Sequence, residues 1–208
     1  MIFVKFPEPG RVKTRIAEAV GAEEAARIYR DLVGRVSGKV VPDERAELQW
    51  EVWVIFDPPE RESAVRDWLE PLFGDAVERF EPQVEGDLGE RLAAAFAAGF
   101  AAGFAKVAAI GTDCVELDAD GIGECWRLLD EKDVVFGPAE DGGYYLVALK
   151  KECAALFAGV PWSSAETLAV SKAVTAQLGL SVGELATLSD VDEIVQWEAL
   201  CVRDVGHR

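Results

Sequence analysis

The 208-residue chain contains almost no histidine and no paired cysteine motif. Its single histidine, His207, is the next-to-last residue, and none of its four cysteines belongs to a Cys-x-x-Cys pair. Zinc sites and disulfide frameworks need closely spaced ligands of these types, so we expect neither. A histidine general base is not expected either, because a side chain so near the terminus is seldom held in place.

Positive charge and long apolar runs are also scarce. The chain has 21 Lys and Arg against 38 Asp and Glu, a formal net charge of −17. A nucleic-acid binder needs a basic face, so we expect no nucleic-acid partner. The most apolar region, 92–109, is interrupted by glycines and a lysine, so we expect neither a membrane span nor a signal peptide. These absences predict a cytoplasmic protein that binds small anions at one local basic site.

Apolar segments alternate with helix-like segments along the whole chain. Strands are predicted at 2–6, 51–56, 77–80, 107–110, 134–136 and 144–148, and helices at 22–36, 59–72, 88–104, 120–129, 165–177 and 191–202. This alternation predicts an α/β fold, a three-layer α/β/α sandwich with a mostly parallel central sheet. The length suits one domain spanning 1–208, with a solvated connection at 38–49.

The densest basic cluster follows the first predicted strand. It runs through Gly10, Arg11, Lys13, Thr14 and Arg15, directly after two prolines. Loop N–H groups, a following helix N-terminus and neighbouring cations together bind phosphate, so this loop is a candidate phosphate site. Its spacing is not that of the P-loop of nucleoside triphosphatases. The alternative is a solvated basic loop beside a buried strand.

Carboxylates follow the later apolar segments. They are Asp113 after 107–110, Glu140 and Asp141 after 134–136, and Asp190 and Asp192 after the apolar stretch 185–188. Ligands of open α/β sheets bind outside the carboxyl ends of the strands. Mg²⁺ and similar hard cations take carboxylate and phosphate oxygens. Cations at one strand end and carboxylates at three others therefore suit a nucleoside phosphate with a divalent metal.

Each carboxylate also has a structural explanation. Asp113 can cap the turn after its strand. Asp190 can be the N-cap of the last predicted helix, with Glu193 completing a capping box. Asp141 with the two glycines after it can form a simple hairpin turn. Their joint position at strand ends favours the functional interpretation over these alternatives.

Five motifs together resemble a known family. They are KFPEPGRVKTR at 5–15, GDLGERL at 86–92, GTDC at 111–114, DGGYYL at 141–146 and WSS at 162–164. This set resembles bacterial and archaeal glycosyltransferases or nucleotide-diphospho-sugar transferases of the GT-A fold (DUF2064-like), some of them associated with arsenosugar biosynthesis. The resemblance covers nearly the whole chain. Phospholactate and molybdenum-cofactor guanylyltransferases are similar more distantly. Val115 departs from the pattern, which has proline there, and Ser164 replaces an expected threonine.

The resemblance implies a role for each matching residue. The nucleotide would be bound by Gly10, Arg11, Lys13, Thr14, Arg15 and Thr112. Asp113 and Asp190 would hold Mg²⁺ or Mn²⁺, with Asp192 as the alternate ligand. Gly142 and Gly143 would let the backbone approach the sugar or acceptor, and Trp162 is a candidate acceptor contact because it lies in a loop. Asp141, or Glu140 beside it, is the candidate catalytic base, and Lys13 the catalytic cation.

The expected activity is metal-dependent transfer from a nucleotide-activated substrate. We expect glycosyl transfer from a nucleotide sugar to a small acceptor. The alternative is nucleotidyl transfer, in which a phosphorylated small molecule attacks the α-phosphate of a nucleoside triphosphate. A third, non-catalytic alternative is a nucleotide-binding module. The partners would be a nucleotide sugar or nucleoside triphosphate and a small acceptor, in a chain that can form a homodimer.

Overall fold

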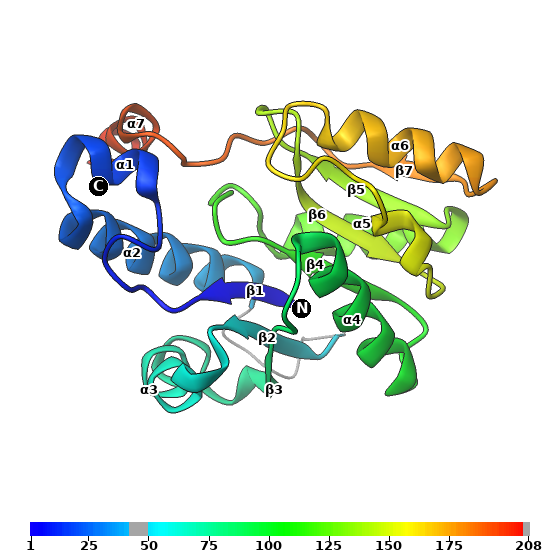
Figure 1. Ribbon diagram of the computed structural model, residues 1–208, viewed down its shortest axis with the longest axis horizontal. Helices are drawn as coiled ribbons and strands as arrows, with labels where there is room; N and C mark the ends of the chain where they lie inside the picture. The colour runs from blue at the N-terminus through cyan, green and yellow to red at the C-terminus, as the bar shows by residue number, and fades with distance from the viewer. Residues whose placement is uncertain (42–49, 206–208) are drawn as a thin grey trace.

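The computed structural model describes residues 1–41 and 50–205 and shows one sheet with helices on both faces (Figure 1). The strands are β1 (Ile2–Lys5), β2 (Val52–Asp57), β3 (Val77–Pro82), β4 (Val107–Ile110), β5 (Val134–Pro138), β6 (Tyr144–Leu149) and β7 (Val182–Glu184). The α-helices are α1 (Thr14–Val20), α2 (Ala22–Val40), α3 (Glu62–Phe73), α4 (Leu88–Ala101), α5 (Ala119–Glu131), α6 (Thr167–Gln177) and α7 (Ile194–Val205). Short 3-10 helices are η2 (Pro59–Arg61), η3 (Gly74–Ala76) and η4 (Ala154–Phe157). Among the described helices, none is long and apolar enough to cross a membrane.

The strand order of the seven-stranded sheet is β3-β2-β1-β4-β6-β5-β7. All neighbouring pairs are parallel except the two that include β6, which runs antiparallel to β4 and β5. The predicted mostly parallel three-layer sandwich is therefore confirmed. The chain continues from β1 to β2 on one side, whereas β4 adds on the other, so the strand order switches at β1 and β4. The carboxyl ends of strands at such a switch form the usual ligand crevice of an open α/β sheet.

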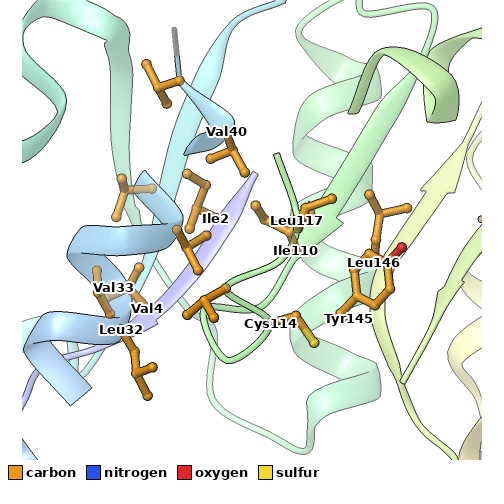
Figure 2. Close-up of a cluster of buried hydrophobic side chains, with 14 of the residues drawn as sticks. Ile2, Val4, Leu32, Val33, Val40, Ile110, Cys114, Leu117, Tyr145 and Leu146 are labelled. Atoms are coloured by element: carbon orange, nitrogen blue, oxygen red, sulfur yellow. The ribbon is translucent and has the colours of Figure 1, made fainter. Parts of the chain in front are cut away.

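Alternating side chains of β2 divide the core between the two faces. Val54 and Phe56 pack with α2, α3 and α5 in one buried cluster, whereas Trp53 and Ile55 pack against α4 on the other face. Figure 2 shows part of the first cluster, where Leu32 of α2 lies against β1. The strand buries side chains on both faces, as the short apolar sequence pattern predicts. Two rigid apolar layers thus hold the loops at the carboxyl edge.

One α-helix and one strand of the described residues were not predicted. Helix α1 has only seven residues and follows a loop dense in charge, and Gly21 (φ 88°) separates it from α2. Strand β7 has three residues, and the apolar stretch 185–188 that was expected to precede the Asp190 loop lies after it. Such short elements carry too little periodicity to be read from sequence. Of the predicted connection at 38–49, residues 42–49 lie outside the described residues, as does His207.

Several predicted ends shift by a few residues. Helix α4 stops at Ala101, three residues before its predicted end, and Gly103 lies just beyond it with φ 96°. Helix α7 begins at Ile194 rather than at 191. Helix α2 continues to Val40, where 36 was predicted, because Val40 remains buried on its apolar face. The carboxyl ends of the six predicted strands lie within two residues of their predicted positions, so the loops of the candidate site follow the segments that the sequence indicated.

Candidate active site

The basic loop after β1 turns sharply into α1. Gly10 has φ 79°, and Lys13 takes a left-handed conformation (φ 46°) at the N-cap of α1. The backbone N–H of Arg11 donates to the carbonyl of Glu8 at 3.0 Å. A left-handed backbone is uncommon for lysine, so the surrounding contacts must hold it there. The contacts of the Lys13 side chain supply that reason.

The ammonium of Lys13 is buried between two carboxylates. Its Nζ lies 2.8 Å from Oδ1 of Asp113 and 2.7 Å from Oδ1 of Asp192, and the side chain is 6% exposed. Burial opposes the charge, but Asp113 and Asp192 outweigh it and raise the pKa of Lys13. Its ammonium joins two carboxylates that lie 79 residues apart in the chain. Direct contact between Lys13 and phosphates stays a prediction.

The two arginines of the loop remain open to solvent. The side chain of Arg11 is 72% exposed and lies 3.6 Å from Glu8. That of Arg15 is 65% exposed and lies 3.7 Å from Asp192. Exposed ion pairs of this length contribute little and exchange partners easily. Arg11 and Arg15 are therefore the cations of this loop that an incoming phosphate can reach.

Three carboxylates converge beside this loop. Oxygen atoms of Asp141, Asp190 and Asp192 all lie within 4.8 Å of one another. Partial burial, together with the negative charges of Asp192 and Asp141, raises the pKa of Asp190 to about 6. Burial also opposes the charge of Asp192, but Lys13, together with Arg15, lowers its pKa. Ionisation of Asp190 is therefore opposed both by its burial and by the negative charges of its two neighbours.

Backbone hydrogen bonds fix the Asp190 loop between two strand ends. The N–H of Val191 donates to the carbonyl of Asp113 at 3.0 Å, and the N–H of Glu140 donates to the carbonyl of Leu188 at 3.1 Å. The loop is therefore tied to the segments after β4 and β5. The capping alternative for Asp190 is wrong, because α7 begins four residues later. There the side chain of Gln196 accepts the N–H groups of Asp192 and Glu193.

The segment of Asp141 is a tight connection between antiparallel β5 and β6, as the hairpin alternative proposed. Oδ1 of Asp141 accepts the N–H of Gly143 at 2.7 Å. Gly142 has φ 88°, and a Cβ there would lie 2.2 Å from the carbonyl oxygen of Ala165. The close approach at Gly142 is thus to the protein's own backbone. Substrate contact at Gly142 and Gly143 stays a prediction.

Two other predicted contacts point into the protein. Thr112 is 4% exposed, and its hydroxyl donates to that of Tyr29 at 3.4 Å. Trp162 packs against a buried cluster that includes Leu92, and its ring lies edge-on to Tyr144. Both side chains therefore have packing roles that need no ligand. Thr14, by contrast, is exposed at the first turn of α1, where a phosphate can reach it.

The three converging carboxylates fit a hard divalent cation. Asp190 and Asp192 supply the two oxygens that the Asp-x-Asp spacing suggested, and Asp141 supplies the third. A role of Asp141 as a base stays a prediction, and its position after a strand end was the sequence signal that it lies near the other carboxylates. Asp113 was predicted as a metal ligand with Asp190. The structure places Oδ1 of Asp113 against Lys13, and ligation of a metal by Asp113 stays a prediction.

The sheet order and this carboxyl edge place the chain in the class of nucleotide-diphospho-sugar transferase-like α/β proteins. The chain is 30% identical to a "putative nucleotide-diphospho-sugar transferase" from Desulfovibrio desulfuricans G20, with a TM-score of 0.81 over 93% of this chain and 81% of that one. Residues 43–164 match the family described as "Uncharacterized protein conserved in bacteria (DUF2064)". The chain belongs to this family, and no curated protein matches it.

Two further solved structures share the fold at low identity. One is a CMP:2-keto-3-deoxy-manno-octonic acid synthetase complexed with CTP, 13% identical, with a TM-score of 0.57 over 100% of this chain and 98% of that one. The other is a cytidylyltransferase from Leptospira borgpetersenii serovar Hardjo-bovis, 12% identical, with a TM-score of 0.56 over 96% of this chain and 82% of that one. At such identities the likeness concerns the fold alone.

Proposed function

We propose that this protein is a metal-dependent transferase that acts on a nucleotide-activated substrate, and that it transfers a sugar from a nucleotide-diphospho-sugar to a small acceptor. The observation that carries the proposal is the convergence of Asp141, Asp190 and Asp192 beside the basic loop. The relative from Desulfovibrio desulfuricans, named for the same reaction class, supports it. The cluster lies at the carboxyl edge of the sheet, where ligands of this fold bind.

The acidic and the basic residues of the site have different proposed roles. Asp141, Asp190 and Asp192 would hold Mg²⁺ or Mn²⁺, which when bound neutralises charge on a diphosphate. Arg11 and Arg15 bind the phosphates from the open side of the loop. Lys13 lies between Asp113 and Asp192, compensates their negative charges and fixes their positions. A leaving diphosphate would thus meet positive charge from the metal and from both arginines, which lowers the barrier to its departure.

One observation favours nucleotidyl transfer as the second candidate. Asp141, the residue predicted as the base for an acceptor hydroxyl, is one of the three converging carboxylates. A carboxylate that holds a cation is a poor general base. An attacking phosphate is already anionic and needs no base, so a phosphorylated acceptor and a nucleoside triphosphate suit this arrangement. Sugar transfer with retained configuration also needs no dedicated base.

Product analysis separates the two reactions. The protein is incubated with nucleoside triphosphates or nucleotide sugars, candidate acceptors and Mg²⁺ or Mn²⁺. Sugar transfer releases a nucleoside diphosphate, whereas nucleotidyl transfer releases pyrophosphate. Asp190→Asn should abolish turnover and metal-dependent nucleotide binding, while Asp67→Asn on the exposed side of α3 should change neither. If no nucleotide raises the melting temperature with either metal, the proposal fails.

A further inference from the structure

A second polar cluster lies at the carboxyl ends of β1, β2 and β3, apart from the three converging carboxylates Asp141, Asp190 and Asp192. Asp57 ends β2, Gln83 follows β3, and Arg91 extends from the first turns of α4. The Nη1 of Arg91 lies 3.6 Å from Oδ2 of Asp57 and donates to Oε1 of Gln83 at 2.9 Å. These three residues are called the β2 cluster below. The proposed function assigns no role to it.

The β2 cluster is held in place by several fixed partners. Gln83 is buried, and its Nε2 donates to the carbonyl of Ile55 at 3.0 Å. The Nε of Arg91 donates to the carbonyl of Gly86 at 3.0 Å. A capping box of Asp87 and Glu90 fixes the start of α4, from which Arg91 extends. The guanidinium is therefore preorganised before any ligand arrives, which lowers the entropic cost of binding.

The solvent-accessible side of the β2 cluster has polar atoms that can still form hydrogen bonds. The side chains of Asp57 and Arg91 are 28% and 24% exposed. Within residues 1–41 and 50–205, the Asp57 carboxylate makes no hydrogen bond and only the 3.6 Å ion pair, so both of its oxygens can still accept hydrogen bonds. An acceptor pair and a guanidinium donor thus stand side by side at the crevice.

The β2 cluster adjoins the loop proposed to bind phosphates. Asp57 is the register partner of Lys5 on β1, and its carbonyl accepts the N–H of Phe6 at 2.7 Å. The chain then runs through Gly10 to Lys13, whose ammonium contacts Asp192, one of the three converging carboxylates. A nucleotide whose phosphates lie at those carboxylates therefore has the β2 and β3 strand ends available for its base.

We propose that Asp57 and Arg91 recognise the base of the bound nucleotide and select guanine, so that the donor is a guanosine nucleotide or a guanosine-diphospho-sugar. This inference rests on the proposed function. Guanine presents two neighbouring N–H donors, at N1 and at the 2-amino group, which match both oxygens of one carboxylate. Its O6 accepts from the adjacent guanidinium. Adenine, cytosine and uracil each lack such a pair of neighbouring donor groups.

Calorimetric binding of nucleoside diphosphates in the presence of Mg²⁺ tests this selection. GDP should bind most tightly, and IDP, which lacks the 2-amino group, should bind roughly tenfold more weakly. Asp57→Asn should weaken GDP binding roughly tenfold to a hundredfold and improve XDP binding, because the new amide N–H can donate to the 2-carbonyl of xanthine. Asp67→Asn should leave the order of affinities unchanged. A gain of XDP binding cannot arise from unfolding.

The outcomes separate this inference from the proposed function. If CDP, UDP or ADP binds the wild-type chain more tightly than GDP, guanine selection is overturned while the transferase proposal stands. If Asp57→Asn folds and keeps the wild-type order of affinities, Asp57 does not recognise the base. If Asp57→Asn does not fold, the wild-type comparison of GDP with IDP still decides. If no nucleotide binds with either metal, both proposals fail together.

Discussion

The Nζ of Lys13 lies 2.7 Å from Oδ1 of Asp192, although 179 residues separate them. This contact joins the start of α1 to the loop before α7, and Figure 1 shows these first and last helices side by side. Asp192 also belongs to the group with Asp141 and Asp190. One carboxylate therefore connects the basic loop to the candidate metal site.

Removing the charge of Lys13 should destabilise the fold. In Lys13→Met, Asp113 and Asp192 lose their shared counter-ion, and breaking a buried pair is costly. Both carboxylates are partly solvated, at 44% and 33% exposed, so we expect a loss of about 2 kcal/mol. Thermal unfolding should show a melting temperature lower by about 4–8 °C.

Arg15→Met is the matched control for Lys13→Met. Arg15 is two residues further along, is 65% exposed, and pairs with the same Asp192 at a longer distance. Its loss should change stability by less than about 0.5 kcal/mol. Equal effects of the two substitutions would show that burial of Lys13 does not determine the strength of the Asp192 contact.

The raised pKa of Asp190 predicts a pH-dependent stability. Its pKa is about 6 in the folded protein against an ordinary value of 3.8, so the folded chain binds this proton more tightly than the unfolded chain. The contribution is favourable below about pH 4 and is lost as the pH rises through 6. Asp190→Asn should therefore equal wild type in stability near pH 4. Above pH 6 it should be more stable by about 1 kcal/mol, a value reduced for solvent screening.

Thermal unfolding from pH 4 to pH 8 with a chelator present measures this difference. Adding Mg²⁺ or Mn²⁺ at pH 7.5 should reverse the order of stability, because the metal stabilises wild type and not Asp190→Asn. A variant that stays less stable than wild type at every pH without metal would show that Asp190 is not under repulsion from Asp141 and Asp192.

The sequence was sufficient for every strand of the sheet except β7, and for the edge that carries the site. Six of the strands, including β1 and β4, were located because buried strands are short apolar runs bounded by turn residues. Asp141 was found as a carboxylate after a strand end, and Asp190 and Asp192 as carboxylates after the apolar stretch 185–188. Which of them meet depends on backbone bonds such as that from Val191 to Asp113, which no local pattern encodes.

Lys13 shows what sequence could not decide. A lysine in a basic loop reads as a phosphate ligand, and only tertiary structure reveals that its ammonium is buried against Asp113 and Asp192. The same limit applies to Gly142. Two glycines after an aspartate suggest room for a substrate, whereas the neighbour that excludes a side chain is Ala165 of the protein itself.

The hydroxyl of Tyr29 should stabilise the strand ends that line the crevice. It accepts the backbone N–H of Lys5 at 2.9 Å and the hydroxyl of Thr112 at 3.4 Å, and thus joins the ends of β1 and β4. Tyr29→Phe leaves the Lys5 N–H without this partner, which should cost about 1–2 kcal/mol. Chemical denaturation measures the loss. An unchanged unfolding midpoint would mean that water replaces the hydroxyl at no cost.

Gly142 should not tolerate even a methyl group. In Gly142→Ala the Cβ would lie 2.2 Å from the Ala165 carbonyl, and φ of 88° is strained for alanine, so we expect a loss of more than about 2 kcal/mol. Gly123→Ala in α5 is the matched control, because nothing lies within 4 Å of its Cβ position and alanine favours helices. It should stabilise the protein by about 0.5–1 kcal/mol. Calorimetric unfolding of both variants tests the pair, and a Gly142→Ala protein as stable as wild type would show that the connection between β5 and β6 moves freely away from Ala165.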